Sequence, residues 1–297
     1  MELEYFIKPT DVEEEWRAQH AAWVETRLAW HIGIGIDPAL LSIEQHKPDK
    51  LAHYARACSD IMFKFPFGVS ELEGCAHRGG YDLTQHASAS GKSAEYTDEE
   101  TKAKVGDARA RERRGARPRA RPRASLLRPR APRRRPRLPR APPPHALPAP
   151  FWFGPAQYVP HVIEPSVGVD RCFLAVLCSA YAEDVVNGEA RTLLRFHPRV
   201  APIKVGVFPL VKNNEQIMES ARELHKRLQR RHNVAFDAAG NIGRRYRRMD
   251  EAGTPFCVTV DFQTLEDGTV TLRDRDSTAQ RRVSPDELVA FVADACE

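Results

Sequence analysis

A run of arginine and proline divides this chain and limits what each side of it can fold into. Between Asp107 and Pro150 there are fifteen arginines, eleven prolines and two acidic residues, a local charge of +13. The whole chain carries +5, so the residues outside this tract together carry −8. Residues 105–152 have almost no periodic apolar face to offset the entropy of ordering, and we expect them to be disordered. RNA phosphates could bind such arginines, but patterned sequence stops and resumes abruptly around the tract, which favours an inserted artefact over a functional module.

The flanks of this tract have the composition of ordinary folded domains. The chain of 297 residues is long enough for two domains, each with its own core. No apolar run approaches the ~18 residues of a membrane span, and the acidic N-terminus shows no basic-then-apolar leader, so we expect neither a membrane nor a secretory signal. The six cysteines form no C-x-x-C pair, which favours reduced thiols in a cytoplasmic protein over disulfides or a metal site.

Apolar spacing and turn residues predict the elements before the tract. Trp16, Trp23 and Trp30 recur at roughly helical spacing within residues 10–35, and Thr10 suits the N-cap of that helix. The other predicted elements are a helix over Asp49–Cys58, strands over Ile61–Phe65 and Val69–Gly74 joined by the turn Pro66–Gly68, and a short loop or helix over Tyr81–His86.

The segment YVPHVIEPSVGVDR, which follows the tract, runs from a predicted strand into an apolar helix. The two-residue period of a strand puts Glu164 and Ser166 on one face, and Pro165, which lacks an N–H, should end the strand. Gly168 lets a ligand approach the backbone, and Arg171 opens the helix. An acid, a hydroxyl and an arginine at one junction could hold an ammonium group beside a polyphosphate. An ordinary helix entry with surface charges would explain the segment equally well.

Three predicted strands carry paired polar residues on one face: Glu2 with Glu4, Glu71 with Glu73, and Glu164 with Ser166. If these strands are neighbours, their carboxylates converge without a matching cluster of cations, and a primary ammonium would neutralise them. Gly74 and Gly168 would leave room only for a small substrate. The alternative is that one glutamate of each pair faces water, which we expect of Glu73 and Glu4.

Strands and helices alternate after residue 201. We predict strands over Ile203–Leu210, Asn233–Asp237, Thr254–Asp261 and Gly268–Arg273, and helices over Asn214–Arg231, Arg244–Glu251 and Ser284–Ala295. Ser284 and Glu287 form a capping box at the last helix. The fold class is therefore α/β, with an antiparallel sheet before residue 198 and a mixed sheet after it.

These residues carry a family resemblance. VIEPSVGVDR resembles motif 3 of class II aminoacyl-tRNA synthetases, and nearly the whole chain outside the tract resembles bacterial-type homodimeric glycyl-tRNA synthetase, a class IIa enzyme. The stretches FPFGVSELEG, HRGGYDLTQH and GNIGRRYRRMDEAGTPFCVTVDFQTLEDGTVTLRDRD carry the same resemblance. It implies part of a catalytic domain at residues 1–104 and 153–197, an insertion at 105–152, and an anticodon-binding domain at 198–297.

The resemblance also implies roles for residues. The catalytic residues would be Arg171 and Glu164. Glycine would be bound by Glu2, Glu71, Glu164, Ser166 and Gly168. ATP would be bound by Glu71, Leu72, Gly168, Val169, Asp170 and Arg171, with the Arg171 guanidinium on the γ-phosphate. Phosphates or anticodon bases of tRNA would meet Arg244, Arg245, Arg247 and Arg248, although a solvated basic helix face accounts for any single one of them.

The implied reaction is ATP-dependent activation of glycine to glycyl-adenylate, followed by transfer to tRNA(Gly). Mg²⁺ would bridge the ATP phosphates, and the family is dimeric. Two departures stand against activity. The dimer-forming motif 1 and the first part of motif 2, with its arginine for the ATP α-phosphate, are absent, and the insertion falls just before motif 3. We therefore expect an incomplete copy that is weak or inactive on its own.

Two other functions stay open. A non-catalytic RNA- or polymerase-binding module with this architecture would be expected to lose the pocket acids, whereas Glu2, Glu71 and Glu164 are present. A class IIa synthetase for threonine, proline or histidine would have other pocket residues and, for threonine, a metal site, but no suitable Cys/His cluster is evident along the sequence.

Overall fold

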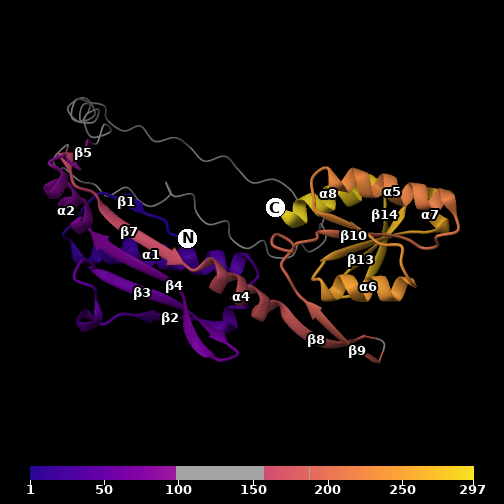
Figure 1. The fold of residues 1–297 in the computed structure, drawn as a ribbon, viewed down its shortest axis with the longest axis horizontal. Coiled ribbons are helices and arrows are strands. Elements are labelled where there is room, and N and C mark those ends of the chain that lie inside the picture. Colours follow the sequence, from indigo (N-terminus) through magenta and orange to yellow (C-terminus); the bar gives the residue numbers. More distant parts are fainter. Residues whose placement is uncertain (98–156, 187) are drawn as a thin grey trace, which may run out of the picture. The chain divides into compact units, whose positions relative to one another are not determined.

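A computed structural model of the chain describes residues 1–97, 157–186 and 188–297 (Figure 1). The disorder predicted for residues 105–152 lies outside these described residues. The described chain divides into two compact units, and the division crosses four strands of the first sheet, between Ile43 and Glu44, Asp60 and Ile61, Leu72 and Glu73, and Ser166 and Val167.

The first sheet has five strands in the order β1-β7-β4-β3-β2. Their bounds are β1 Tyr5–Ile7, β2 Leu41–Gln45, β3 Ala57–Phe65, β4 Gly68–Gly79 and β7 His161–Val167. β1 runs antiparallel to β7, with Tyr5 opposite Ile163. The predicted turn between β3 and β4 is confirmed, and Gly68 at its end adopts a φ of 126°, a region that side chains disfavour.

The helix predicted within residues 10–35 is confirmed as α1, Glu13–Gly33. It covers one face of the first sheet, where Val24 packs with Cys75 of β4 and Ile163 of β7 (Figure 1). The His20 ring bonds through Nε2 to the Cys75 carbonyl oxygen at 2.9 Å. Burial lowers the pKa of His20, so the ring stays neutral and packs as part of this core.

The helix predicted over Asp49–Cys58 is wrong. Only a short 3₁₀ turn, Pro48–Lys50, forms there, and β3 already begins at Ala57. The middle of the stretch is a turn in which the Ala55 N–H donates to the Ala52 carbonyl at 2.9 Å, and its end joins the sheet, where the Arg56 N–H donates to the His77 carbonyl at 2.7 Å. Sheet pairing therefore overrides the local helical pattern.

The strand containing Pro165 also runs further than predicted, because β7 continues to Val167. Pro165 takes part as an acceptor only: its carbonyl receives the Leu3 N–H at 3.0 Å. Glu2 and Ser166 form an antiparallel bridge beside it.

Helix α4, Val169–Ala180, follows β7 directly. Its Cys172 and Ala175 are buried in a cluster with Phe63, Phe65 and Leu72. The remaining elements before residue 198 are the 3₁₀ turn Pro38–Leu40, α2 Tyr81–Ser90, β5 Tyr96–Thr97, β6 Gln157–Tyr158, β8 Tyr181–Val186 and β9 Glu189–Leu194. β8 and β9 form an antiparallel hairpin that the sequence pattern did not predict.

The C-terminal sheet has the order β11-β10-β12-β13-β14, in which β10 pairs parallel with β11 and β12 and the other pairs are antiparallel. Its elements are β10 Val205–Pro209, α5 Glu215–Gln229, β11 Val234–Phe236, α6 Ile242–Glu251, β12 Phe256–Val260, α7 Phe262–Asp267, β13 Val270–Asp274, β14 Gln280–Val283 and α8 Pro285–Cys296. The mixed sheet and the α/β class are thus confirmed, while α7 and β14 were not predicted.

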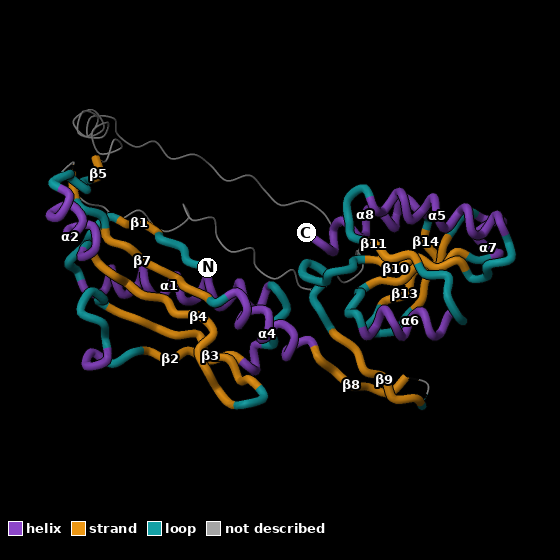
Figure 2. The backbone as a smooth tube through the Cα atoms, viewed as in Figure 1, coloured by secondary structure: helices purple, strands orange, loops and turns teal. Residues whose placement is uncertain are grey.

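Alternation along β10 separates the two faces of this sheet. Val205 and Val207 are fully buried among residues of α5 and α8, whereas Phe208 contacts the Tyr246 ring of α6. Figure 2 shows α5 and α8 along one side of the sheet and α6 along the other. A Cβ on Gly206 would lie only 3.0 Å from Met249 of α6, so glycine permits this close packing. Among the described helices, none combines the length and the apolar character needed to cross a membrane.

Candidate active site

The predicted site residues lie on two consecutive elements, with Glu164 and Ser166 on β7 and Arg171 in the first turn of α4. Glu164 is mostly buried and is ion-paired with Arg78 of β4, whose Nη1 donates to the Glu164 carboxylate. Nε of the same guanidinium donates to Asp82 at 2.8 Å. These hydrogen bonds, first to Asp82 and then to Glu164, raise the pKa of Arg78 above its usual range.

Tyr54 completes this cluster from the loop between β2 and β3. The Arg78 guanidinium lies over the Tyr54 ring at 4.4 Å from its centroid. Arg78 is thus held on one side by two carboxylates and on its face by an aromatic ring, so its position and that of Glu164 are fixed together.

Arg78 is the residue that reading the sequence missed, and it changes the electrostatics expected of the site. The acids do not converge without cations, because Glu164 pairs with Arg78 and Glu73 pairs with Arg27. Glu73 was expected to face water, and this is wrong: it is 1% exposed, and Arg27 of α1 donates to its two carboxylate oxygens at 2.5 and 3.2 Å. The spacing of Arg78 and Asp82 was a usable signal, since residues four apart can pair.

The other acids of the predicted site are open to solvent. Glu2, Glu4 and Glu71 are exposed, as expected of Glu4. The backbone bridge between Glu2 and Ser166 brings the N-terminal strand beside the end of β7. Glu2 therefore lies opposite Ser166 in the backbone pairing.

The start of α4 has two features that suit an anion. Gly168 is its N-cap, and Arg171 is exposed and donates from Nη1 to the Glu71 carbonyl at 2.8 Å. The other N–H groups of this guanidinium, together with the free N–H groups of the first helical turn, suit phosphate oxygens. Val169 and Asp170 are exposed in the same turn.

Two predicted nucleotide contacts differ in what they can offer. Gly168 has a φ of −70°, and a Cβ added to it would meet the Arg171 Cβ at 3.6 Å, an ordinary contact distance. Its conformation therefore does not require glycine. Leu72 is only 2% exposed in the core cluster, so its side chain is not available to ATP and only its backbone could contribute.

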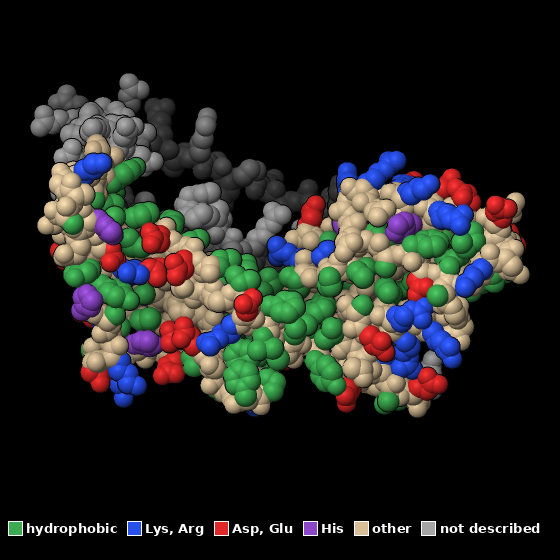
Figure 3. Space-filling model, in the orientation of Figure 1, with side chains coloured by type: hydrophobic (Ala, Val, Ile, Leu, Met, Phe, Trp, Pro, Cys, Tyr) green, Lys and Arg blue, Asp and Glu red, His purple; other side chains and the backbone are tan. Residues whose placement is uncertain are grey.

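Three of the four arginines of α6 differ in their contacts. Arg244 is exposed, and its guanidinium makes no hydrogen bond or ion pair with the described residues. Arg247 donates to the Ala190 carbonyl at 2.7 Å and to Glu189 at 2.8 Å. Arg248 pairs with Asp237. Lys and Arg side chains gather on the drawn face of the C-terminal sheet and its helices (Figure 3).

Arg245 departs from its predicted role. It is 2% exposed, and its guanidinium donates to four backbone carbonyls, those of Pro209, Ala238, Ala239 and Gly240. Burial lowers its pKa. A guanidinium occupied in this way ties α6 to β10 and to the preceding loop and does not reach a ligand.

A cavity of about 520 Å³ opens between the β8–β9 hairpin, α6 and β13. Its wall includes the exposed Arg244 and the buried Asp250, on which Arg191 and Arg273 converge. The free charge at its mouth is therefore positive, which suits an anionic ligand.

Known proteins resemble the C-terminal sheet and, more widely, nearly the whole chain. A family profile described as "Anticodon binding domain" matches residues 204–295, which hold the whole C-terminal sheet. A glycine–tRNA ligase of Thermobifida fusca (strain YX) is 39% identical over 99% of the chain. Glycine–tRNA ligases of Lachnospira eligens and Clostridium tetani (strain Massachusetts / E88) are each 38% identical, over 99% and 100% of the chain. The chain covers 53%, 51% and 51% of these relatives, about half of their length.

Proposed function

Because the chain is related over nearly its whole length to glycine–tRNA ligases, we propose that it binds glycine and ATP in the way these enzymes do and carries an anticodon-type RNA-binding domain. The observation that carries this proposal is the end of β7, where Glu164 is fixed by Arg78 and is followed, four residues later, by the helix N-terminus at Gly168.

Glu164 would hold the ammonium group of glycine. Its pairing with Arg78 occupies one carboxylate oxygen and leaves the second for the substrate. Glu2, Glu71 and Ser166 would add further acceptors. A pocket that merely lacks a methyl-binding surface discriminates glycine from a larger amino acid by only about 1–3 kcal/mol. Steric exclusion of the larger side chain must therefore supply the remaining selectivity for glycine.

ATP, as its magnesium complex, would lie at the start of α4. The exposed Arg171 would bind the γ-phosphate, and Gly168 would let the nucleotide approach the backbone. A glycine carboxylate oxygen would attack the α-phosphorus, the bond from that phosphorus to the β-phosphate oxygen would break, and pyrophosphate would leave. Mg²⁺ would neutralise phosphate charge, and the exposed Glu71 carboxylate is an oxygen donor of the kind it prefers.

The glycyl group would then pass to the 3′-terminal adenosine of tRNA(Gly). Arg244, Arg247 and the cavity beside them are the surface that we assign to the RNA. The predicted domain boundaries, a homodimeric assembly as in the family and a cytoplasmic location belong to the same proposal.

The second candidate is an RNA-binding module without catalysis. It is favoured by the C-terminal sheet with its own core, which the family profile covers. In that case Glu164 and Arg171 would be structural remnants.

Glycine-dependent exchange of pyrophosphate into ATP separates the two. The full chain should show weak, glycine-dependent exchange that Glu164→Gln lowers at least tenfold, about 1.4 kcal/mol in transition-state binding. Glu4→Gln, which removes an exposed carboxylate outside the proposed site, should leave the rate unchanged. Absence of glycine-dependent exchange would favour the non-catalytic module, and exchange that survives Glu164→Gln would contradict the role given to Glu164.

A further inference from the structure

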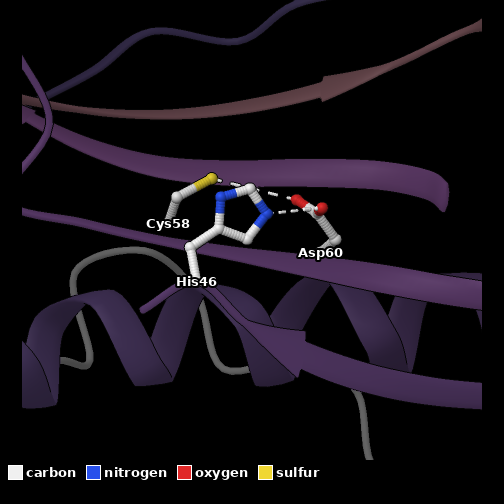
Figure 4. A group of neighbouring side chains, drawn as sticks. All are labelled: His46, Cys58 and Asp60. Atoms are coloured by element: carbon white, nitrogen blue, oxygen red, sulfur yellow. Dashed lines mark hydrogen bonds and ion pairs between the residues drawn. The ribbon is translucent and has the colours of Figure 1, made fainter. Parts of the chain in front are cut away.

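A cluster of three different ligand-type side chains lies at the edge of the first sheet, away from β7 and α4. His46 directly follows β2, and its N–H donates to the Cys58 carbonyl of β3 at 2.9 Å. This bond places His46 beside Cys58 across the two strands. Cys58 and Asp60 are two residues apart on β3, so their side chains leave the same face of the strand. Figure 4 shows all three side chains turned toward one another.

The donor atoms are close enough to share one ion. His46 Nε2 and Asp60 Oδ2 are 2.7 Å apart, and the Cys58 thiol donates to Asp60 Oδ1 at 3.8 Å. One ligand atom from each residue lies within 4.8 Å of the other two. Zn²⁺ binds sulfur at about 2.3 Å and nitrogen or oxygen at about 2.0–2.2 Å, so tetrahedral ligands are roughly 3.5 Å apart. Binding therefore needs small rotations of the side chains while the strands stay in place.

The chemistry of the donors selects the metal. One imidazole nitrogen, one sulfur and one carboxylate oxygen suit Zn²⁺, whereas Mg²⁺ and Ca²⁺ take oxygen ligands. The three side chains are partly exposed, with 31% for His46 and 14% for Asp60, so an ion can enter from solvent. We propose that His46, Cys58 and Asp60 form a Zn²⁺ site whose fourth position is taken by water. This revises the expectation, based on cysteine spacing, that the chain has no metal site.

The site has a clear structural consequence. It closes the loop between β2 and β3, which carries Tyr54 and Arg56. Tyr54 lies over the Arg78 guanidinium, and Arg56 donates to the Thr10 carbonyl at 3.0 Å. Zinc would act as a clip on this loop and so help to position Arg78, independently of what Arg78 binds.

Cobalt substitution tests the proposal on the full chain, purified without a polyhistidine tag and stripped of metal. Co²⁺ should bind at one equivalent per chain, with the absorption of a tetrahedral site and one sulfur-to-cobalt charge-transfer band, and Zn²⁺ should displace it. Cys58→Ser should abolish the charge-transfer band, and Asp60→Asn and His46→Gln should each weaken binding roughly 100-fold or more. Cys296→Ser, which removes a half-buried thiol elsewhere, should change nothing. A wild-type chain without the band, or a band that survives Cys58→Ser, overturns the proposal.

A second measurement needs no substitution and so does not depend on how the variants fold. Alkylation of the wild-type thiols is followed by mass spectrometry with and without Zn²⁺. Zinc should slow modification of Cys58 at least tenfold and leave Cys178, which is also half-buried, unchanged. Equal rates for Cys58 with and without zinc would show that the thiol is not a ligand.

Discussion

Asp250 is the buried charge whose removal should cost the most stability. It is 1% exposed at the end of α6 and accepts from Arg273 at 2.8 and 3.0 Å and from Arg191 at 3.0 Å. Both arginines are also buried, at 6% and 2% exposure. Asp250→Asn keeps the size of the side chain but leaves two buried guanidinium groups short of a negative charge. Breaking a buried pair by removing one partner costs about 3–5 kcal/mol, and we expect a loss in that range.

Urea denaturation and hydrogen exchange measure this loss together. The unfolding midpoint of the C-terminal sheet should fall, and amides of α6 and β13 should exchange faster, while amides of α1 keep their protection. Asp276→Asn is the matched control, because Asp276 is 52% exposed and its pairs should contribute about 1 kcal/mol or less. If Asp250→Asn cost no more than this control, the inference that the two buried arginines depend on the Asp250 charge would be refuted.

Three further outcomes follow from individual residues. Gly168→Ala should leave stability unchanged or raise it by up to about 1 kcal/mol, since the Gly168 φ of −70° suits alanine. Calorimetry should show that the same change weakens ATP binding about tenfold. Unchanged ATP affinity would contradict a close approach of the nucleotide to the backbone. Arg244→Ala should weaken tRNA binding and reduce the slope of log affinity against log salt concentration by about 1, without destabilising the fold. Arg245→Ala should instead lower the melting temperature. Equal effects of the two substitutions would contradict the different placement of these arginines. Burial lowers the pKa of His77 and of His161 to about 4, below the ~6.5 of an unfolded chain. The unfolded state therefore binds more protons between these values, and stability should fall from pH 7 to pH 5 by roughly 2 kcal/mol for each histidine, about 4 kcal/mol for both. A flat urea midpoint over that window would contradict this expectation.

Local signals were enough to predict much of the fold. The capping box of Ser284 and Glu287 marks the start of α8, and the structure forms both of its hydrogen bonds. Alternation and turn residues located β3, β4 and most of the C-terminal sheet. The false helix over Asp49–Cys58 shows the limit, since bonds to His77 and from His46 draw the end of that stretch into the sheet, and those partners are distant in sequence.

The candidate site was predictable only in part for the same reason. Glu164, Gly168 and Arg171 lie within one continuous segment, so their proximity could be read from the sequence. Arg78 pairs with Glu164 across the sheet, and only the strand order brings β4 beside β7. The burial of Arg245 could not be predicted for the same reason, because the sequence of a basic helix does not show which arginine the packing of that helix buries.

Binding of a stable glycyl-adenylate analogue tests the central claim most directly, because it does not require the chain to complete catalysis. Calorimetry on the full chain should give tighter binding for the glycyl analogue than for its threonyl or prolyl counterpart, and Glu164→Gln should weaken the glycyl analogue about tenfold or more. Equal affinity for the three analogues, or preference for a larger one, would contradict a glycine site at the end of β7.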